Sequence, residues 1–542
     1  MVRSCYIGID IGTSNSAACK VREDGTQEMI QTKGGGNLFA SVVKFESGGK
    51  ASLVPKSDGG FRNIQKHILE GNVVMYAKRV IGKKYSDERV QRSKRCCKAQ
   101  VNEDANGYAS FYIPAWNRLV SPEEVYTVII NAIWERVLVK VDGGKEIIKG
   151  VTFTVPADYR HEERMAIKRA IQDSNVNMPY RILNEPCAAA IAFGCNNTER
   201  NGVFAMYDLG GGTFDTALIQ IEKGRNFSII GVDGDSAIGG SYFDDCIVNY
   251  IRREKEKRGN MGNEFCDVDD GSDEKTKLRY NRILFQLTEV CREAKETLSS
   301  VDKAEIEMEK YQQFLDKELK NSGITLVDDE YVLTRETFNK IISKDIETTI
   351  EIMRRCIDDA DVSEDEIKRI LLVGGSSRIR LISKLLAKEF GDNVITETEN
   401  PDEVVARGAA LYAKEKELRD VNIEERVKWD ICTQVKKGKT IRYDPLIRRG
   451  EMIPIKNRVK EYFVSENKMG YFRDVLAEGI VEDEKTMKVL KAFETDEARS
   501  EDGGDITILY SISITEEGIL KMKIQEKGTG RMILDEMEVQ TI

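Results

Sequence analysis

Short apolar runs that end in tight turns alternate with longer amphipathic stretches from the start of the chain to about residue 415. The run Val151–Val155 stops at Pro156, and the run Ile370–Val373 ends at a pair of glycines. The segment Asn400–Glu403 carries helix-start signals: an N-cap Asn, a Pro in the first turn and two acids at the positive end of the helix dipole. This alternation predicts a layered α/β architecture for most of the chain.

The pattern changes beyond residue 415. Residues 416–428 are dominated by charged side chains, which predicts a linker. Apolar residues then recur at every second position, as in Ile506–Ile514 and Ile519–Ile524, with a turn at Gly518 between them. This period of two predicts that residues 429–542 form an antiparallel β domain.

Hydropathy limits the class of protein. Although 41% of the residues are hydrophobic, no stretch approaches the roughly 18 apolar residues of a membrane span. The first residues lead directly into the apolar segment Tyr6–Ile9, without the long apolar core and cleavage site of a signal peptide. We therefore expect a cytoplasmic protein that does not cross a membrane and that has several domains in its 542 residues.

Charge and cysteine content exclude further classes. The net charge of −10 argues against nucleic acid as a partner, and the basic run Arg89–Lys98 is expected to be a solvated face. The 11 cysteines include no Cys-x-x-Cys pair, and only two histidines are present, so a disulfide scaffold or a zinc site is not expected. We expect buried, reduced thiols instead.

Two segments of the α/β region, residues 7–16 and 206–215, share one order of residues: an apolar strand, an Asp, an apolar residue, glycine and hydroxyl residues. Glycines let backbone amides approach phosphate oxygens where a side chain would collide. A carboxylate at the strand end fits beside phosphate only with magnesium or its water shell between them, which assigns Asp10 and Asp208 to a Mg²⁺ site. The candidate phosphate-binding residues are Gly12, Thr13, Ser14, Asn15, Gly210, Gly211, Gly212 and Thr213.

One such loop is common and usually structural, but two of them about 200 residues apart indicate duplicated lobes that face each other across a cleft. A third glycine turn, Gly374–Arg378, precedes another helix. There the backbone can approach a nucleoside, with Arg378 covering its base. The sequence therefore predicts a nucleotide held between two lobes.

With these motifs the chain resembles the DnaK-type, seventy-kilodalton heat-shock chaperone family over most of residues 5–415. The resemblance rests on the segments Ala77–Gly82, Val155–Ala157, Asn184–Gly194, Asp208–Asp215 and Val373–Ile379. It implies an actin-like, ribonuclease H-like ATPase domain with lobe I in residues 1–195 and lobe II in 196–415. Residues of about 385–415 are expected to return to lobe I, and a β-sandwich domain that binds peptides is expected to follow the linker.

The resemblance also implies roles for single residues. Lys78 matches the lysine that orients the attacking water and meets the charge that develops on the γ-phosphate, which is physically reasonable for phosphoryl transfer. Asp10, Glu185, Asp208 and Asp215 match acids that arrange magnesium, potassium and water. Pro156 and Arg164 match a switch that relays nucleotide state to the neighbouring domain. The implied catalytic residues are Lys78, Glu185, Asp208, Thr213 and Asp215. Further ATP or ADP contacts are implied for Gly239, Gly240, Lys295, Ser299, Gly374, Gly375, Ser376, Arg378 and Asp402.

This sequence departs from the family pattern at several places. Arg292 occupies the position of a usual glutamate on the helix that closes over adenosine, and Glu296 replaces a frequent base-stacking arginine. The linker is more polar than the family's leucine-rich one, which predicts weaker coupling between domains. The helical lid over the peptide channel is expected to be absent, so bound peptide should leave quickly. The segment Trp429–Val435 is the expected place to look for the channel.

We therefore expect an ATP-hydrolysing, chaperone-like protein that couples nucleotide state to the binding of an unfolded peptide or a dedicated client protein. A J-domain co-chaperone and a nucleotide exchange factor are the expected partners. The alternatives are a nucleotide-controlled regulatory module with a weak ATPase, an actin-like filament protein and a small-molecule kinase of the same fold.

Overall fold

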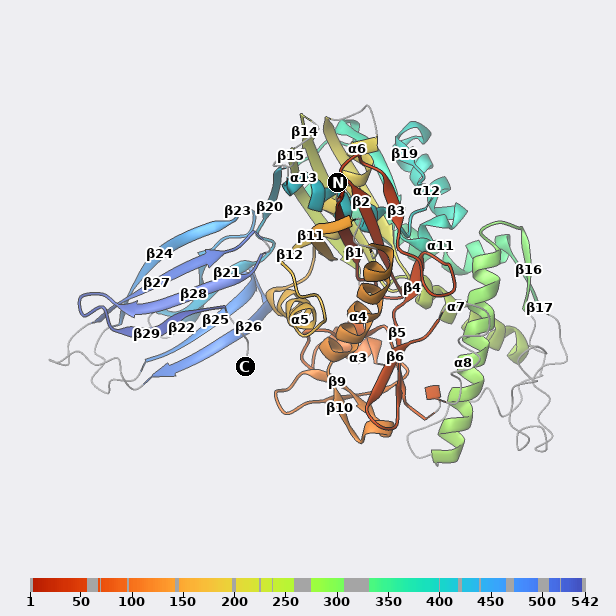
Figure 1. The fold of residues 1–542 in the computed structure, drawn as a ribbon, viewed down its shortest axis with the longest axis horizontal. Coiled ribbons are helices and arrows are strands. Elements are labelled where there is room, and N and C mark those ends of the chain that lie inside the picture. Colours follow the sequence, from red (N-terminus) through yellow and green to blue (C-terminus); the bar gives the residue numbers. More distant parts are fainter. Residues whose placement is uncertain are drawn as a thin grey trace.

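The computed structural model describes most of the chain as two mixed sheets with covering helices, followed by an all-β region (Figure 1). The described residues are 3–55, 67–68, 70–94, 97–141, 146–196, 201–223, 226–235, 237–257, 274–306, 331–398, 400–417, 422–437, 440–464, 472–495, 506–516 and 518–538.

The first sheet is built around β1, Arg3–Asp10, whose apolar side chains are buried. The strand order is β12-β11-β1-β2-β3, and β4 also pairs with β2. β1 runs parallel to β11 and antiparallel to β2, and the helices α4 and α5 pack on each other over this sheet. The bounds are β2 (Asn15–Arg22), β3 (Gln27–Met29), β4 (Leu38–Ala40), β11 (Glu146–Val155), β12 (Tyr180–Asn184), α4 (Pro122–Val141) and α5 (His161–Gln172).

Smaller elements extend this first lobe and carry the segment with Lys78. Two three-stranded sheets flank the short helices η1 and α3. Their elements are β5 (Val42–Glu46), β6 (Lys50–Leu53), β7 (Val73–Met75), η1 (Ala77–Arg79), α3 (Glu88–Ser93), β8 (Gln100–Glu103), β9 (Ala109–Ile113), η2 (Pro114–Trp116) and β10 (Arg118–Val120).

The second sheet repeats the hairpin that begins the first. β13 runs antiparallel to β14 and parallel to β18, in the order β19-β18-β13-β14-β15-β20-β23. Its elements are β13 (Gly202–Leu209), β14 (Phe214–Glu222), β15 (Asn226–Asp235), α7 (Gly240–Lys257), α8 (Glu274–Thr297), β16 (Lys303–Ile306), β17 (Tyr331–Thr334), α11 (Arg335–Asp359), η4 (Glu364–Glu366), β18 (Ile367–Val373), η5 (Gly375–Arg378), α12 (Arg380–Phe390), η6 (Asp392–Val394) and β19 (Ile395–Thr396).

Two helices, α6 (Glu185–Asn196) and α13 (Val404–Glu417), join the lobes through one shared apolar core. They pack closely because Gly408 has no side chain: a Cβ there would lie 1.7 Å from the backbone oxygen of Ala188. α13 also packs against β1, β2 and β11. This placement supports the proposal that the chain returns to lobe I before residue 415.

The all-β region contains two four-stranded antiparallel sheets with a common apolar core, in the orders β22-β21-β25-β26 and β24-β27-β28-β29. The alternating burial of β27, Ile506–Ile514, matches the predicted period of two. The other strands are β21 (Asp430–Lys437), β22 (Thr440–Ile447), β24 (Ile455–Val464), β25 (Phe472–Ile480), β26 (Asp483–Thr495), β28 (Leu520–Glu526) and β29 (Met532–Glu538).

The segment expected to be a linker contains a strand, β20 (Asn422–Arg426). It pairs in parallel with β15 and antiparallel with β23 (Met452–Ile453), so it extends the sheet of the second lobe towards the β domain (Figure 1). Backbone pairing with β15 and β23 connects this segment to both neighbouring strands.

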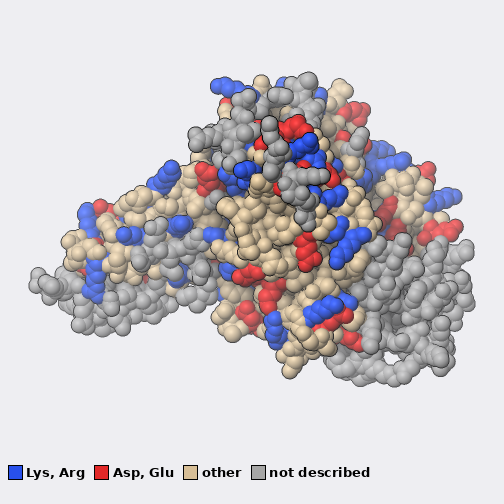
Figure 2. All heavy atoms as spheres, in the orientation of Figure 1, with Lys and Arg blue, Asp and Glu red and all other residues tan. Residues whose placement is uncertain are grey.

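Basic and acidic side chains are interspersed over the visible surface, and the described part of that face shows no broad patch of one sign (Figure 2). Within the part of the chain that the structure describes, no helix is both long enough and apolar enough to span a bilayer. The structure describes the side chains of eight cysteines; all eight are thiols outside any disulfide, and seven of them are buried.

Candidate functional site

The two repeated segments form equivalent turns at the ends of equivalent hairpins. Asp10 ends β1 opposite Ala17 of β2, and Asp208 lies near the end of β13 opposite Asp215 of β14. In both hairpins the strand fixes the carboxylate at the sheet edge, and the glycine turn follows it. The sequence similarity of the loops is therefore a similarity of structure.

The turns lie directly against each other across the cleft. A Cβ on Gly211 would lie 2.1 Å from the Ser14 hydroxyl oxygen, and one on Gly212 would lie 2.6 Å from a Thr13 methyl carbon. A Cβ on Gly239 would meet the backbone of Gly212 at 2.6 Å. Only glycine permits such close approach, which explains the glycine-rich sequence of the second turn.

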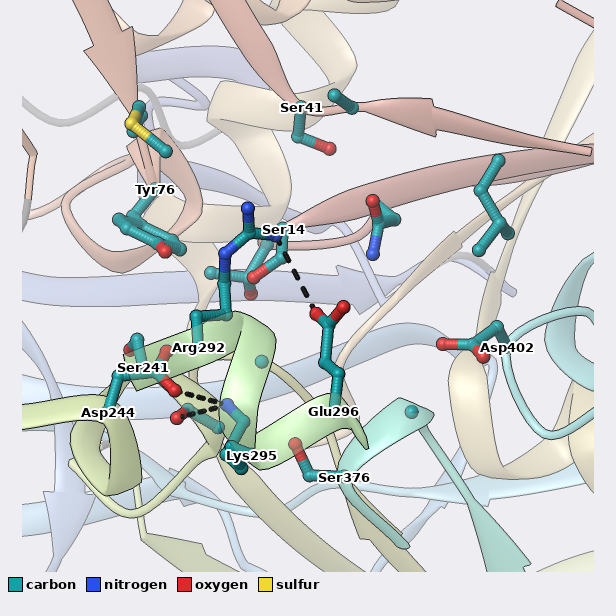
Figure 3. A pocket seen from close by; sticks show the side chains of 18 of the residues that line it. Ser14, Ser41, Tyr76, Ser241, Asp244, Arg292, Lys295, Glu296, Ser376 and Asp402 are labelled. Carbon is teal, nitrogen blue, oxygen red and sulfur yellow. Dashed lines mark hydrogen bonds and ion pairs between the residues drawn. The ribbon is translucent and has the colours of Figure 1, made fainter. Parts of the chain in front are cut away.

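A cavity of about 330 Å³ opens from these turns towards α8 and η5 (Figure 3). The predicted nucleotide-binding residues that line it are Thr13, Ser14, Asn15, Gly211, Gly240, Lys295, Ser299, Gly375, Ser376, Arg378 and Asp402. A second cavity of about 90 Å³ shares several of these residues and continues beneath the turns. It adds Asp10, Gly12, Lys78, Glu185, Asp208, Gly210, Thr213, Asp215 and Gly374.

Acidic side chains and one lysine dominate the second, smaller cavity, which we call the inner cavity. Lys78 Nζ lies 2.6 Å from Glu185 Oε1, and both side chains are buried. Thr154 Oγ1 donates to Asp10 Oδ1 at 3.1 Å, and Thr213 Oγ1 donates to Asp215 Oδ2 at 2.9 Å. These contacts fix the orientation of the carboxylates.

The acids titrate abnormally because they share one buried space. Burial, followed by the charge of neighbouring carboxylates, raises the pKa of Asp208 well above its usual value and that of Asp215 to about 8. Burial also raises the pKa of Glu185 to about 7, against the opposing effect of Lys78, and raises the pKa of Asp10. For Lys78, burial alone would lower the pKa, but Glu185 and Asp10 outweigh it and the pKa is raised. Such a site favours the binding of a cation.

The oxygen donors fit magnesium, provided that the ion keeps its water shell. Carboxylate oxygens are the ligands that Mg²⁺ prefers, and it usually retains several waters. Among the described residues no three His, Cys, Asp or Glu side chains converge closely enough to coordinate one ion directly. The structure is thus compatible with a hydrated ion between these acids and a phosphate chain.

Two charged residues at this site were not predicted from the sequence: Asp244, which lines the larger, outer cavity, and Arg79, which lies outside the cavity lining. Asp244 Oδ1 forms an ion pair with Lys295 Nζ at 2.7 Å. The same Nζ donates a hydrogen bond to the Gly240 carbonyl oxygen at 2.7 Å. Arg79 crosses between the lobes, where its Nη2 donates to the Gly212 carbonyl oxygen at 2.6 Å and to Ser241 Oγ at 3.0 Å. Arg79 stands in the Ala77–Gly82 motif next to Lys78, so its position could have indicated a role.

The predicted switch residues lie away from the phosphate turns. Arg164 Nη2 donates to Asn184 Oδ1 at 2.6 Å, and Asn184 directly precedes Glu185. A Cβ on Gly518 of the β domain would lie 3.2 Å from the Arg164 guanidinium. Arg164 therefore lies between the inner cavity and the β domain. Pro156 directly follows β11, before the loop that leads into α5, and it lines neither of the two cavities at the phosphate turns.

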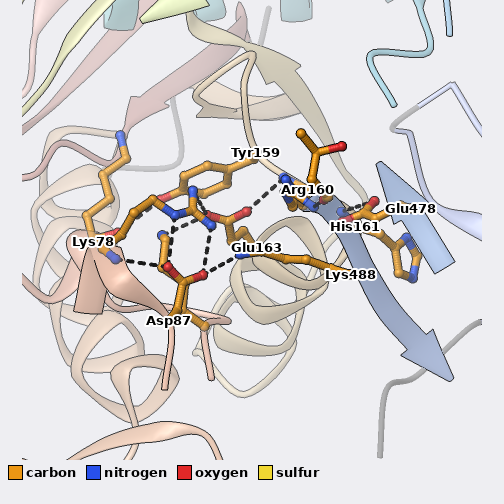
Figure 4. A network of polar contacts seen from close by, with 11 residues as sticks. Lys78, Asp87, Tyr159, Arg160, His161, Glu163, Glu478 and Lys488 are labelled. Carbon is orange, nitrogen blue, oxygen red and sulfur yellow. Dashed lines mark hydrogen bonds and ion pairs between the residues drawn. The ribbon is translucent and has the colours of Figure 1, made fainter. Parts of the chain in front are cut away.

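The first turn of α5 contacts the β domain through neighbouring side chains (Figure 4). The Arg160 guanidinium lies 4.2 Å from the centre of the Trp429 ring, and Arg160 Nη1 donates to the Thr486 carbonyl oxygen at 3.2 Å. His161 N donates to Glu478 Oε2 at 3.4 Å. Trp429 therefore belongs to this interface, although its segment was the expected place for a peptide channel.

A charged network continues from this turn to the segment that bears Lys78 (Figure 4). Glu163 is buried, pairs with Lys83 Nζ at 2.6 Å and accepts from Arg89 Nη1 at 3.4 Å. Asp87 caps α3, pairs with Arg89 and forms an ion pair with Lys488 of β26. The network therefore joins lobe I to the β domain.

Comparison with known proteins agrees with this arrangement. The Hsp70 protein family model matches residues 6–540. The chain is 31% identical to the chaperone protein HscA of Cronobacter sakazakii over 76% of its own length and 58% of that protein. It is 32% identical to the heat shock protein hsp-6 of Caenorhabditis elegans, over 75% and 56% of the two chains.

A third relative is matched along almost the whole chain. Identity to the chaperone protein dnaK of Cyanidium caldarium is 30% over 99% of this chain and 82% of that protein. By contrast, the match to HscA spans less than two thirds of that relative. The family match covers both the cleft and the β domain, and the chain therefore belongs to the Hsp70 family.

Proposed function

We propose that this protein binds and hydrolyses ATP and that it works as a chaperone, with nucleotide state controlling the binding of a peptide or client protein to its β domain. The observation that carries this proposal is the buried Lys78–Glu185 pair, 2.6 Å apart, beneath two facing glycine turns. Phosphoryl transfer depends on positioning and charge neutralisation, and this arrangement can provide both.

In this proposal the two turns hold the phosphates through backbone amides and the hydroxyls of Thr13, Ser14 and Thr213. Lys78 orients the attacking water and stabilises negative charge on the γ-phosphate. Asp10 and Asp208 hold hydrated magnesium, which neutralises phosphate charge when bound, and potassium is a second cation for the same cluster of acids. Glu185 and Asp215 fix the surrounding water.

The nucleoside then lies in the larger cavity between α8 and η5. Lys295 and Ser299 contact it from α8, and Gly375, Ser376 and Arg378 contact it from η5. The lobe boundary near residue 195 and the domain boundaries near residues 415 and 428 are part of the same proposal.

The β domain offers a place for an extended peptide. β22 and β24 are edge strands of their two sheets, and Lys460 of β24 pairs with Asp444 of β22 at 2.5 Å. Exposed Ile441, Val459 and Phe463 lie on these two strands. An edge strand with exposed apolar side chains suits the main-chain pairing by which extended peptides bind. We extend the proposal to the family's general partners, a J-domain co-chaperone and a nucleotide exchange factor.

The contacts of α5 with the β domain would couple the two sites. Arg164 bonds to Asn184, the residue before Glu185, and it lies against the β domain at Gly518. Pro156 and Arg164 therefore keep their proposed role as a switch.

The test is the rate of ATP hydrolysis by the full chain with and without an unfolded peptide. We expect turnover in the presence of magnesium, and we expect added peptide to accelerate it. If no member of a broad peptide library changes the rate of ATP hydrolysis, control by peptide is rejected. If the chain does not hydrolyse ATP at all, the ATPase activity itself is rejected.

A further inference from the structure

The walls of the larger cavity carry both signs of charge in unequal number. Among the described residues that line it, four carboxylates face three cations. The acids are Asp244, Glu289, Glu296 and Asp402, and the bases are Arg292, Lys295 and Arg378. The phosphates, which carry the negative charge of a nucleotide, are proposed to bind at the opposite end of the cavity. The surplus carboxylate therefore lies on the side proposed for the nucleoside.

Each cation already has a close acidic partner. Lys295 Nζ lies 2.7 Å from Asp244 Oδ1, and Arg378 Nη2 lies 3.2 Å from Asp402 Oδ2. Arg292 Nη2 lies 2.6 Å from Glu289 Oε2. These three pairs are short enough for charge-assisted hydrogen bonds.

Glu296 forms only a longer ion pair, with Arg292, which already pairs with Glu289 (Figure 3). Its Oε1 lies 3.6 Å from Arg292 Nη1, beyond hydrogen-bond length, and its side chain keeps 58% of its exposure. Figure 3 shows the Glu296 carboxylate extending from α8 into the cavity, on the side opposite Asp402. It is therefore the carboxylate best able to accept hydrogen bonds from an incoming ligand.

We propose that Glu296 selects the base of the bound nucleotide by accepting a hydrogen bond from an amino group, which in ATP is the 6-amino group of adenine. The assignment rests on the proposed function, because it places the phosphates at the two glycine turns and hence the base between α8 and η5. A carboxylate accepts but cannot donate, so it favours an amino group and repels a keto oxygen at the same position.

The pairing of Arg292 with Glu289 supports a preference for an amino group over a keto oxygen on the base. A guanidinium free to turn towards the base would donate to a keto group and favour guanine or hypoxanthine. Glu289 holds Arg292 at 2.6 Å, and the Arg292 side chain is 23% exposed against 58% for Glu296. The acceptor Glu296 is therefore the more accessible of the two groups. The departure from the family pattern at positions 292 and 296 thus replaces base stacking on one arginine with recognition of the base edge.

The test is calorimetric binding, with magnesium, of ATP, purine riboside triphosphate and GTP to the full chain. Purine riboside triphosphate lacks the 6-amino group, and GTP carries a keto oxygen there. We expect the wild-type chain to bind ATP about five- to tenfold more tightly than purine riboside triphosphate, as one hydrogen bond to a half-exposed charge allows. We expect GTP to bind more weakly than ATP.

Glu296→Ala should bring the affinities for ATP and purine riboside triphosphate together and narrow the gap to GTP. Glu296→Gln keeps an acceptor oxygen without the charge. Its ratio of affinities for ATP and purine riboside triphosphate should lie between those of the wild type and Glu296→Ala. Glu293→Ala is the matched control, since Glu293 lies on the same helix, is exposed and does not line the cavity. The control should keep the wild-type ratios.

Three outcomes would decide against the inference: equal wild-type binding of ATP and purine riboside triphosphate, an unchanged ratio in Glu296→Ala, or tighter binding of GTP that depends on Glu296. A wild-type chain that binds none of the nucleotides would instead reject the proposed function. Circular dichroism of each variant verifies folding, which a half-exposed position should tolerate.

Discussion

Lys78 and Glu185 form a buried ion pair, with Nζ 2.6 Å from Oε1, beneath the two turns that carry Asp10 and Asp208. A buried pair is rarely a gain in stability over apolar packing, because both charges lose their hydration. Three further acids with raised pKa values, Asp10, Asp208 and Asp215, surround the pair, and this arrangement is better explained by chemistry than by stability.

Replacement of Lys78 by Ala should abolish ATP hydrolysis while leaving ATP binding largely intact. The turns and the larger cavity, which hold the rest of the nucleotide, remain in place, and the lost group acts on the γ-phosphate. Single-turnover hydrolysis of radiolabelled ATP and equilibrium binding measure the two effects separately. Lys33→Ala, at an exposed position, is the control for loss of a positive charge. Unchanged turnover in Lys78→Ala would remove the proposed role of this lysine.

Contact between α5 and the β domain should strengthen as the pH falls through 7. Burial raises the pKa of Glu478 from its ordinary 4.5 to about 7, Arg160 opposes the rise, and Glu163 adds to it. The docked form therefore binds a proton more readily than an undocked form in which Glu478 is solvated. Above pH 7 the buried charge opposes docking, and this cost, up to about 3 kcal/mol, disappears as the pH falls from 7 towards 4.5.

Glu478→Gln should dock more tightly at pH 8 and lose the pH dependence. Trp429 lies in the interface, so its fluorescence reports docking. A Trp429→Phe variant measures the background of the other two tryptophans, which is then subtracted. A wild-type signal that is flat between pH 8 and 6 would show that Glu478 does not titrate on docking.

The ion pair between Asp87 and Lys488 should contribute modestly to the same interface. Lys488 is partly exposed whereas Asp87 is nearly buried, so we expect Lys488→Ala to weaken docking by about 1 kcal/mol, less at high salt. The fluorescence of Trp429 measures this loss of docking. Lys485→Ala is the matched control, because Lys485 lies on the same strand and is exposed. Asp87→Asn keeps a side-chain oxygen for the helix cap but removes the charge. In that background Lys488→Ala should cost less, and an undiminished cost would argue against direct pairing.

The sequence predicted those features that rest on local pattern. The hairpin period placed β27 at Ile506–Ile514, and the repeated Asp–Gly segments predicted two turns that line one cleft. Resemblance to the family brought Lys78 and Glu185, which are 107 residues apart, into one site before any geometry was known.

Contacts set by domain docking could not be predicted. The stacking of Arg160 on Trp429 depends on how the β domain sits on α5, and neither residue is unusual in its own segment. The strand Asn422–Arg426 was missed because its backbone makes the pairing while four of its five residues are polar. Asp244 gave no signal because an acid within a helix is usually solvated, whereas here it is buried against Lys295.

The central claim is that the two facing turns hold nucleotide phosphates together with magnesium. Its most direct test is calorimetric titration of the purified full chain with ATP, with and without Mg²⁺. At about pH 9, above the pKa of about 7 for Glu185 and about 8 for Asp215, these acids are charged and should repel the triphosphate alone. We predict binding of one ATP per chain that magnesium tightens at least tenfold. Binding of equal strength without magnesium, or no binding at all, would contradict the account.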